Sequence, residues 1–165
     1  MRKEMVGLAA EFAVASELCR RDIYAQLTSG HQKRTDLLIF SEDNQLLRIE
    51  VKGKQGGSWP NCKGIYGSNV VLVFVDFAGK GEREPPDFYI LTVREWVAFV
   101  EGEIRRLAPT RIVLDDRNVP IFLDQVDKKG EPYKGMGVSP DQIREHHEKW
   151  EKIEQAVKRG AGRPE

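Results

Sequence analysis

Apolar residues recur at helical spacing near the start of the chain and then in short runs typical of strands. Two apolar runs, 36–40 and 46–52, flank the polar segment 41–45 and predict a β-hairpin. Residues 70–77 are almost all apolar, which is typical of a strand buried on both faces, and 88–91 predict a further strand. A helix is predicted from about residue 4 to 21 by an apolar stripe of Val6, Ala9, Ala10, Ala13, Val14 and Leu18.

Two capping boxes mark the starts of later helices. Thr92 and Glu95 stand three residues apart before an amphipathic stretch, which predicts a helix over 93–107. Ser139 and Gln142 have the same spacing, with proline at the first helical position between them. We therefore predict one C-terminal helix that runs to about residue 158.

The order of these elements predicts an α/β fold around one mixed sheet. The chain of 165 residues suits one domain, which we place at 5–158. Its core is expected at 5–107, and an accessory hairpin and helix at 108–158. Residues 159–165 are expected to be a disordered tail.

Charge and cysteine content narrow the class of protein. Lysine plus arginine equals aspartate plus glutamate at 26 each, which argues against a histone-like protein that coats nucleic acid by bulk charge. No run approaches the roughly 18 apolar residues of a membrane span, so no membrane partner is expected. Cys19 and Cys62 have no CxxC spacing, and we expect reduced thiols in a cytoplasmic protein.

Two charged residues lie on one face of the second hairpin strand. Glu50 and Lys52 are two residues apart, so both side chains leave the same side of the strand. If five loop residues close the hairpin, Phe40 pairs with Leu46, and the same register places Asp36 opposite Glu50. The alternative is a solvated strand face with a surface salt bridge.

Opposed carboxylates favour a bound divalent cation, because like charges about 5 Å apart otherwise repel. Mg²⁺ is usually held by one or two carboxylates together with water. Asp36 and Glu50 meet this need, and the backbone carbonyl of Val51 offers a third oxygen. Lys52 is suited to orient water and to stabilise developing negative charge. The pattern predicts hydrolysis of phosphodiester bonds with a bound metal ion.

Asp36, a hairpin and the sequence Glu50-Val51-Lys52 resemble the (D)…(D/E)-x-K core of the PD-(D/E)XK nuclease superfamily, which includes restriction enzymes and archaeal Holliday junction resolvases. The helix sequence Gly7-Leu-Ala-Ala-Glu11 is similar to the Gly-x-x-Ala-Glu pattern of the resolvase-like branches. The resemblance covers roughly residues 5–95. One departure is that threonine precedes Asp36, where the name of the motif has proline.

This resemblance implies a restriction-endonuclease-like mixed sheet flanked by helices, with a C-terminal helical extension. It implies that Asp36 and Glu50 bind the metal, that Lys52 is the catalytic lysine, and that Glu11 is a further ligand or holds water. The implied activity is that of an endonuclease that depends on Mg²⁺ or Mn²⁺. DNA is the implied substrate.

The glycine-rich segment after the hairpin is expected to emerge at the rim of this site. Lysines suit phosphates and aromatic rings suit bases, so we expect nucleic-acid contacts from Lys54, Gln55, Trp59, Lys63 and Tyr66, with Gln55 as an additional site residue. Lys33 and Arg34, just before Asp36, are expected to contact phosphates. The alternative for both segments is a solvated loop.

Other conspicuous residues have structural interpretations. Asp76 ends an apolar strand and is expected to cap a turn. Trp96 and Trp150 lie on apolar helix faces and are expected in the core or at an interface, whereas His146 and His147 are expected at the surface. The C-terminal helix is expected to pack on the chain's own sheet, although its apolar side also suits a two-fold contact in a homodimer.

Two other functional classes remain open. A non-catalytic module that binds nucleic acid or a protein partner would keep the fold, but it has no use for clustered carboxylates that face phosphates. A small-molecule enzyme on an unrelated α/β fold would need a nucleotide loop or a nucleophile motif, and we find neither in the sequence.

Overall fold

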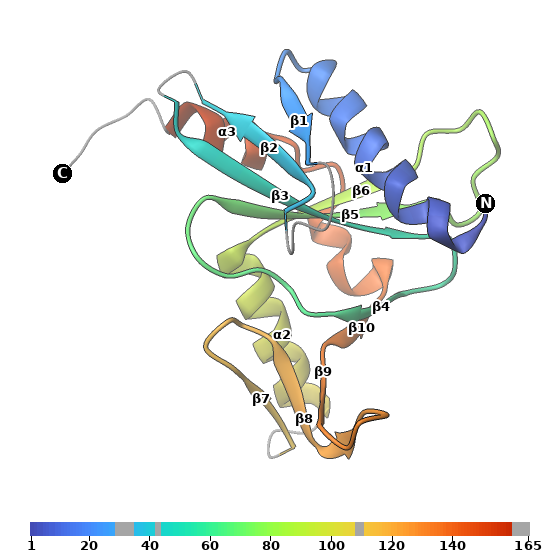
Figure 1. Ribbon diagram of the computed structural model, residues 1–165, viewed down its shortest axis with the longest axis vertical. Helices are drawn as coiled ribbons and strands as arrows, with labels where there is room; N and C mark the ends of the chain where they lie inside the picture. The colour runs from blue at the N-terminus through green and yellow to red at the C-terminus, as the bar shows by residue number, and fades with distance from the viewer. Residues whose placement is uncertain (29–34, 42–43, 108–110, 160–165) are drawn as a thin grey trace.

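A five-stranded mixed sheet forms the centre of the protein in the computed structural model, which describes residues 1–28, 35–41, 44–107 and 111–159 (Figure 1). In spatial order its strands are β1 (Ala25–Leu27), β2 (Leu37–Phe40), β3 (Leu46–Lys54), β5 (Val70–Asp76) and β6 (Asp87–Thr92). Strands β3 and β5 are parallel, and the other neighbouring pairs are antiparallel. The predicted α/β fold around a mixed sheet is confirmed, although the structure has two small sheets in addition to the one that was predicted.

Helices cover both faces of this sheet (Figure 1). One face carries α1 (Lys3–Cys19) and α3 (Glu151–Arg159), and the other carries α2 (Val93–Leu107) and the 3₁₀ helix η1 (Pro140–His146). Two small sheets lie on this second face. One consists of β4 (Trp59–Cys62) and β10 (Met136–Val138), and the other of β7 (Ile112–Leu114), β8 (Pro120–Val126) and β9 (Pro132–Lys134).

The central strand β5 separates two hydrophobic cores. All seven of its residues are buried, as expected for a strand covered on both faces. Its odd-numbered residues, such as Val73, pack in the core shared with α1 and α3. Its even-numbered residues, such as Phe74, pack with α2, β4 and η1. Trp150 lies in the first core and Trp96 in the second, so both tryptophans are core residues, as predicted.

The β2–β3 hairpin has the predicted register. Phe40 pairs with Leu46, and Leu37 pairs with Ile49. The alternation that follows sends one set of apolar side chains into the core beneath α1, namely Leu37, Ile39, Leu47, Ile49 and Val51. The residues between them on β3 therefore face the opposite side of the sheet.

Helix α1 and strand β3 meet at two small residues. A Cβ atom added to Gly53 would lie 2.8 Å from the Cβ of Ala10 and 2.8 Å from the backbone oxygen of Val6. Glycine at this position lets the helix backbone come close to the strand. This contact places the residue after Ala10, which is Glu11, beside the strand that carries Glu50.

The prediction of one continuous C-terminal helix is wrong. The capping box of Ser139 and Gln142 forms, but the helix that it starts is η1, which ends at His146. The Glu148 carboxylate accepts hydrogen bonds from the Phe88 backbone N–H at 3.1 Å and from the Trp150 indole at 2.8 Å. These bonds hold a turn with a positive φ of 54° at Glu148, after which α3 begins.

His146 is buried, contrary to the prediction, whereas His147 is exposed. The ring of His146 is enclosed because Lys152 on α3 folds over it, with Nζ 2.9 Å from Nδ1. Within the described ranges, no helix is both long enough and apolar enough to cross a membrane. Residues 160–165, most of the predicted tail, lie outside the described residues.

Candidate active site

Three charged side chains alternate along one face of β3. Arg48, Glu50 and Lys52 point away from the α1 core, because the apolar residues between them fill it. Glu50 is only 4% exposed, and the Lys52 ammonium lies 2.8 Å from its Oε1 atom. The Lys52 side chain remains 35% exposed. The pair thus joins a buried carboxylate to an ammonium that reaches solvent. The alternative of a fully solvated strand face therefore does not apply to Glu50.

Asp36 lies just before β2, and its side chain bonds to the backbone of β3 beyond the last paired residue of β2. The first residue of β2, Leu37, lies opposite Ile49, so the backbone groups of Val51 extend beyond the paired strand. The Asp36 N–H donates to the Ile49 carbonyl at 2.9 Å, and Asp36 Oδ2 accepts from the Val51 N–H at 2.6 Å. The carboxylate of Asp36 therefore lies at the peptide unit that joins Glu50 to Val51.

The Lys52 ammonium satisfies the next backbone group of the same edge. Besides pairing with Glu50, its Nζ donates to the Val51 carbonyl oxygen at 3.3 Å. A positive charge thus lies against the Glu50 carboxylate and the Val51 carbonyl, two of the oxygen groups predicted to bind metal. In the structure the Lys52 ammonium is the positive charge held by these two oxygen groups.

Glu11 approaches this site from α1. Its side chain is partly buried, and its pKa is raised mainly by burial and further by the Asp36 carboxylate, while the Lys52 ammonium opposes the shift. The charges act on Glu11 because α1 packs closely on β3 at Gly53. The structure therefore brings Glu11 into the electrostatic environment of Asp36 and Lys52.

The oxygen groups at this site suit a hard divalent cation. Two carboxylates and a backbone carbonyl are ligands that Mg²⁺ and Mn²⁺ accept. In the part of the chain that the structure describes, no three His, Cys, Asp or Glu side chains are arranged to hold a metal ion together. A cation here would depend on two carboxylates, the Val51 carbonyl and water, and Mg²⁺ commonly keeps several waters.

Cys62 on β4 lies beside the site, although its sequence position gives little sign of it. Burial raises the pKa of its thiol to about 12, with a smaller lowering effect from Lys52 and a raising effect from Glu50. The Sγ atom lies 3.4 Å from the carbonyl of Trp59 as a donor. Burial therefore favours the neutral thiol of Cys62 over the thiolate, which is the nucleophilic form.

Two residues expected to contact nucleic acid are inside the protein, and those predictions are wrong. Trp59 is 1% exposed; its ring packs against Phe74, and its indole N–H donates to the Val75 carbonyl at 3.1 Å. Lys54 is also buried and pairs with Asp76 at 2.5 Å. Asp76 caps a turn as predicted, because its Oδ1 accepts from the Ala78 N–H at 2.8 Å.

The remaining rim residues are exposed. Lys63 and Tyr66 lie at the surface of the segment between β4 and β5. Gln55 is exposed as well. With its amide oxygen and nitrogen assigned by their hydrogen bonds, the nitrogen donates to the backbone oxygen of Met1 and the oxygen accepts from the Met1 amino group. Lys33 and Arg34 lie outside the described residues.

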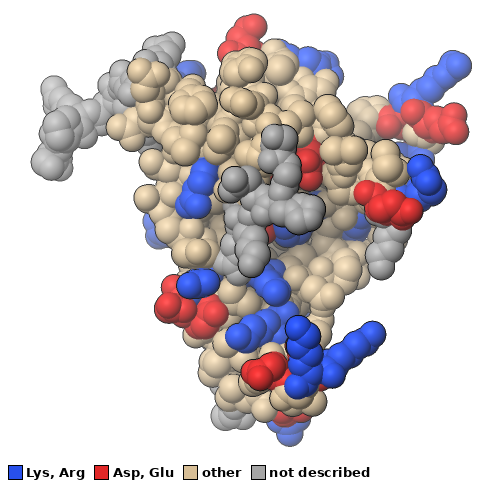
Figure 2. All heavy atoms as spheres, viewed as in Figure 1, with Lys and Arg blue, Asp and Glu red and all other residues tan. Residues whose placement is uncertain are grey.

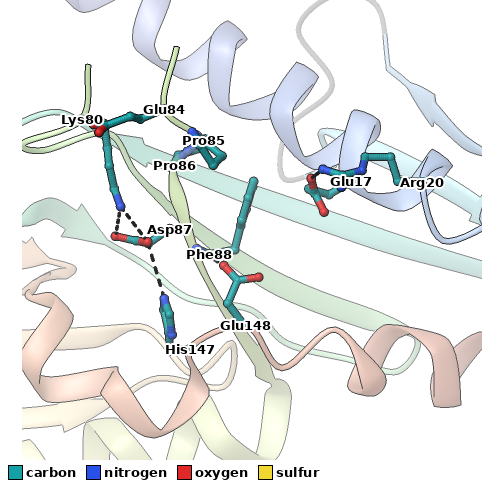
Figure 3. Close-up of a pocket in the computed structure, with 10 residues that line it drawn as sticks. All are labelled: Glu17, Arg20, Lys80, Glu84, Pro85, Pro86, Asp87, Phe88, His147 and Glu148. Carbon is teal, nitrogen blue, oxygen red and sulfur yellow. Dashed lines mark hydrogen bonds and ion pairs between the residues drawn. The ribbon is translucent and has the colours of Figure 1, made fainter. Parts of the chain in front are cut away.

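A separate hollow of about 440 Å³ lies between the end of α1 and the start of β6 (Figure 3). Its charged groups are engaged with one another: Lys80 pairs with Asp87 at 2.9 Å, and Nε2 of His147 lies 3.6 Å from Asp87. The Glu148 carboxylate in its wall bonds to the Phe88 backbone. None of the predicted site residues lines this hollow.

The chain matches no protein-family model and no curated protein by sequence. Its structure is similar to a solved structure described as a bacterial homing endonuclease, with a TM-score of 0.50 and 16% sequence identity. The similarity covers 100% of this chain and 99% of the other. At this level of identity the likeness concerns the fold, which is a mixed sheet flanked by helices.

Proposed function

We propose that this protein is a nuclease of the PD-(D/E)XK type that hydrolyses phosphodiester bonds in DNA with Mg²⁺ or Mn²⁺. The observation that carries the proposal is the arrangement around Val51. Asp36 binds its N–H, and Lys52 bridges its carbonyl and the Glu50 carboxylate. The fold shared with a homing endonuclease supports the proposal as an analogy of fold.

The residues divide into ligands and positioning groups. Asp36, Glu50 and the Val51 carbonyl would hold the ion, and Glu11 would bind it or hold a water molecule. When bound, the ion lowers the pKa of coordinated water and withdraws charge from a phosphoryl oxygen. The burial of Glu50 strengthens its attraction for a cation, because a charge is screened less in the interior than in water.

Lys52 is the residue that links the ligands to the substrate. Its ammonium is anchored on Glu50 in the structure, yet its side chain is flexible and remains partly exposed. With Glu50 held as a ligand of the ion, Lys52 would be free to turn toward a phosphate. There it would orient the attacking water and stabilise the negative charge that develops on the phosphate.

A cleavage assay with matched variants tests this function. Single-stranded, duplex and branched DNA and RNA are incubated with wild-type protein and Mg²⁺, Mn²⁺ or EDTA. We expect DNA cleavage that requires the ion and is lost in Glu50→Gln, which keeps the shape of the side chain but removes its charge. Glu151→Gln is the control, because Glu151 is an exposed residue of α3, on the opposite face of the sheet.

Two outcomes would reject this function. If wild-type protein binds nucleic acid but cuts none of the four substrates with either ion, the fold serves a non-catalytic binding module. If Glu50→Gln cuts as well as wild type, cleavage comes from another site or from a contaminating enzyme. Cleavage of RNA alone would keep the chemistry and change the substrate.

A further inference from the structure

We propose that the turn between β7 and β8 is a second nucleic-acid contact, in which Arg117 binds a phosphate of the strand that occupies the candidate active site. This inference rests on the proposed function, because it extends the same substrate beyond the cleavage site. It assigns a role to the accessory sheet, for which the sequence shows no motif.

The β7–β8 turn is held in a fixed position. Oδ1 of Asp115 accepts hydrogen bonds from the backbone N–H groups of Arg117 and Val119, each at 2.9 Å. The carbonyl of Asn118 accepts from the Trp96 indole at 2.9 Å, and its side-chain amide donates to the Ile65 carbonyl at 3.3 Å. The turn is thereby fastened to α2 and to the segment that precedes β5.

That segment is equally constrained. Gly64 has a φ of 66°, and a Cβ added to it would lie 1.9 Å from the Trp96 ring, so a larger residue does not fit there. Ile65 is buried, and the Tyr66 ring that follows is 37% exposed. The Arg117 guanidinium carbon lies 5.7 Å from the centre of that ring. This cation–π contact orients the guanidinium at the surface.

The segment also lies next to the strand that carries the candidate active site. A Cβ added to Gly67 would lie 3.7 Å from Nη2 of Arg48. Arg48 shares a face of β3 with Glu50 and Lys52, and the four-residue step along the strand from Arg48 to Lys52 spans about 13 Å. Basic groups thus follow one another from Lys52 through Arg48 to the turn, over a length of about four nucleotides or more at 3.4 Å each.

The charges on this path are available to a ligand. Among the described residues, neither Arg48 nor Arg117 forms an ion pair. The carboxylate of Asp115 is turned to backbone N–H groups. Figure 2 shows lysine and arginine side chains, with aspartate and glutamate side chains among them, over the lower part of the visible face, where Figure 1 places β4, β10 and the β7–β8–β9 sheet. The Arg117 guanidinium, which pairs with no described carboxylate, matches the charge and hydrogen-bonding needs of a phosphate.

Binding is measured apart from cleavage. Fluorescence anisotropy with labelled 30-nucleotide single strands and 30-base-pair duplexes, in EDTA, gives the Kd at several salt concentrations. We expect Arg117→Ala to raise the Kd at least about threefold at 0.1 M salt and to lower the salt slope by about 1, as for one lost phosphate contact. Arg117→Lys should keep the slope, and Asp116→Asn on the same turn should tighten binding.

Arg20→Ala is the control, because it removes one exposed arginine, paired with Glu17, just after the end of α1 on the opposite face. If Arg117→Ala binds like wild type while wild type binds and cuts DNA, the turn is not a contact, and the proposed function stands. If wild type binds without cutting and Arg117→Ala weakens binding, the contact stands, and the proposed function fails. If wild type binds neither probe, the inference is overturned.

Discussion

The Asp36 carboxylate accepts a 2.6 Å hydrogen bond from the backbone N–H of Val51. In an antiparallel ladder a backbone carbonyl would accept this bond, so a side chain replaces a main-chain group just where β2 begins. Asp36 therefore stabilises the sheet as well as providing a charge to the candidate active site. Substitution separates the two roles.

We expect Asp36→Ala to lower the free energy of unfolding by about 1–3 kcal/mol, because the Val51 N–H loses its partner. Asp36→Asn keeps an oxygen at the same place, so its free energy of unfolding should fall by less than half as much as that of Asp36→Ala. Both variants should lose cleavage at least about 100-fold, since neither carries the charge. Urea denaturation in EDTA and the DNA cleavage assay measure the two effects. Equal destabilisation by Asn and Ala would mean that the hydrogen bond contributes little.

Lys52→Met should bind Mn²⁺ as tightly as wild type or more tightly, since Lys52 no longer competes for Glu50 and the Val51 carbonyl. Cleavage should fall at least about 100-fold, because the group that stabilises the developing charge is missing. Calorimetric titration with Mn²⁺ and single-turnover cleavage test the two parts. Loss of metal binding in this variant would assign Lys52 to holding the site together.

The buried ion pair of Lys54 and Asp76 gives a stability prediction. Lys54→Met leaves the Asp76 carboxylate in the interior without its cation, which should cost about 3–5 kcal/mol in urea denaturation. Lys80→Met breaks a more exposed pair with Asp87 and should cost less than about 1 kcal/mol. A small effect of Lys54→Met would show that water or a shifted side chain reaches Asp76.

Stability should fall on acidification because of the network around Lys152. Burial lowers the pKa of His146 from 6.5; Lys152 lowers it further, and Glu95 and Glu145 oppose the shift. Burial alone would raise the pKa of Glu95, but hydrogen bonds from Lys152 and Thr92 outweigh it, so that this pKa is lowered from 4.5.

A lowered pKa means that the unfolded chain takes up the proton first. The His146 contribution is therefore full above pH 6.5 and is lost as the pH falls toward its folded pKa. The Glu95 contribution is lost below pH 4.5 in the same way. Urea denaturation between pH 8 and 3.5 should show both losses, and His146→Gln should remove the first. A profile of His146→Gln that matches wild type above pH 4.5 would contradict this assignment.

The sequence predicted the elements that are determined by interactions between residues close together in the chain. The capping box of Thr92 and Glu95 forms because both groups belong to one helical turn. The hairpin register follows from a five-residue loop, so Phe40 and Leu46 pair as expected. The face shared by Glu50 and Lys52 then follows from strand alternation.

The sequence could not predict environments that distant residues create. Lys54 looks like a surface lysine among glycines until β5 brings Asp76 beside it. Trp59 looks like a base-stacking residue until β5 and β6 cover its ring with Phe74 and Tyr89. The break between η1 and α3 depends on the bond from Phe88, 60 residues away, to Glu148.

The contact of Gly53 with Ala10 determines the spacing between helix α1 and strand β3 at the candidate active site. Glu11 follows Ala10 and Lys52 precedes Gly53, so one backbone contact determines how far apart the helix and strand hold their charged groups. A residue one methyl group larger at position 53 would push the helix away and widen this spacing while every charged side chain stayed in place. The dimensions of the site therefore depend on Gly53 and Ala10, two of the smallest residues in the chain. A redesign of its metal preference or substrate would have to begin with these two positions.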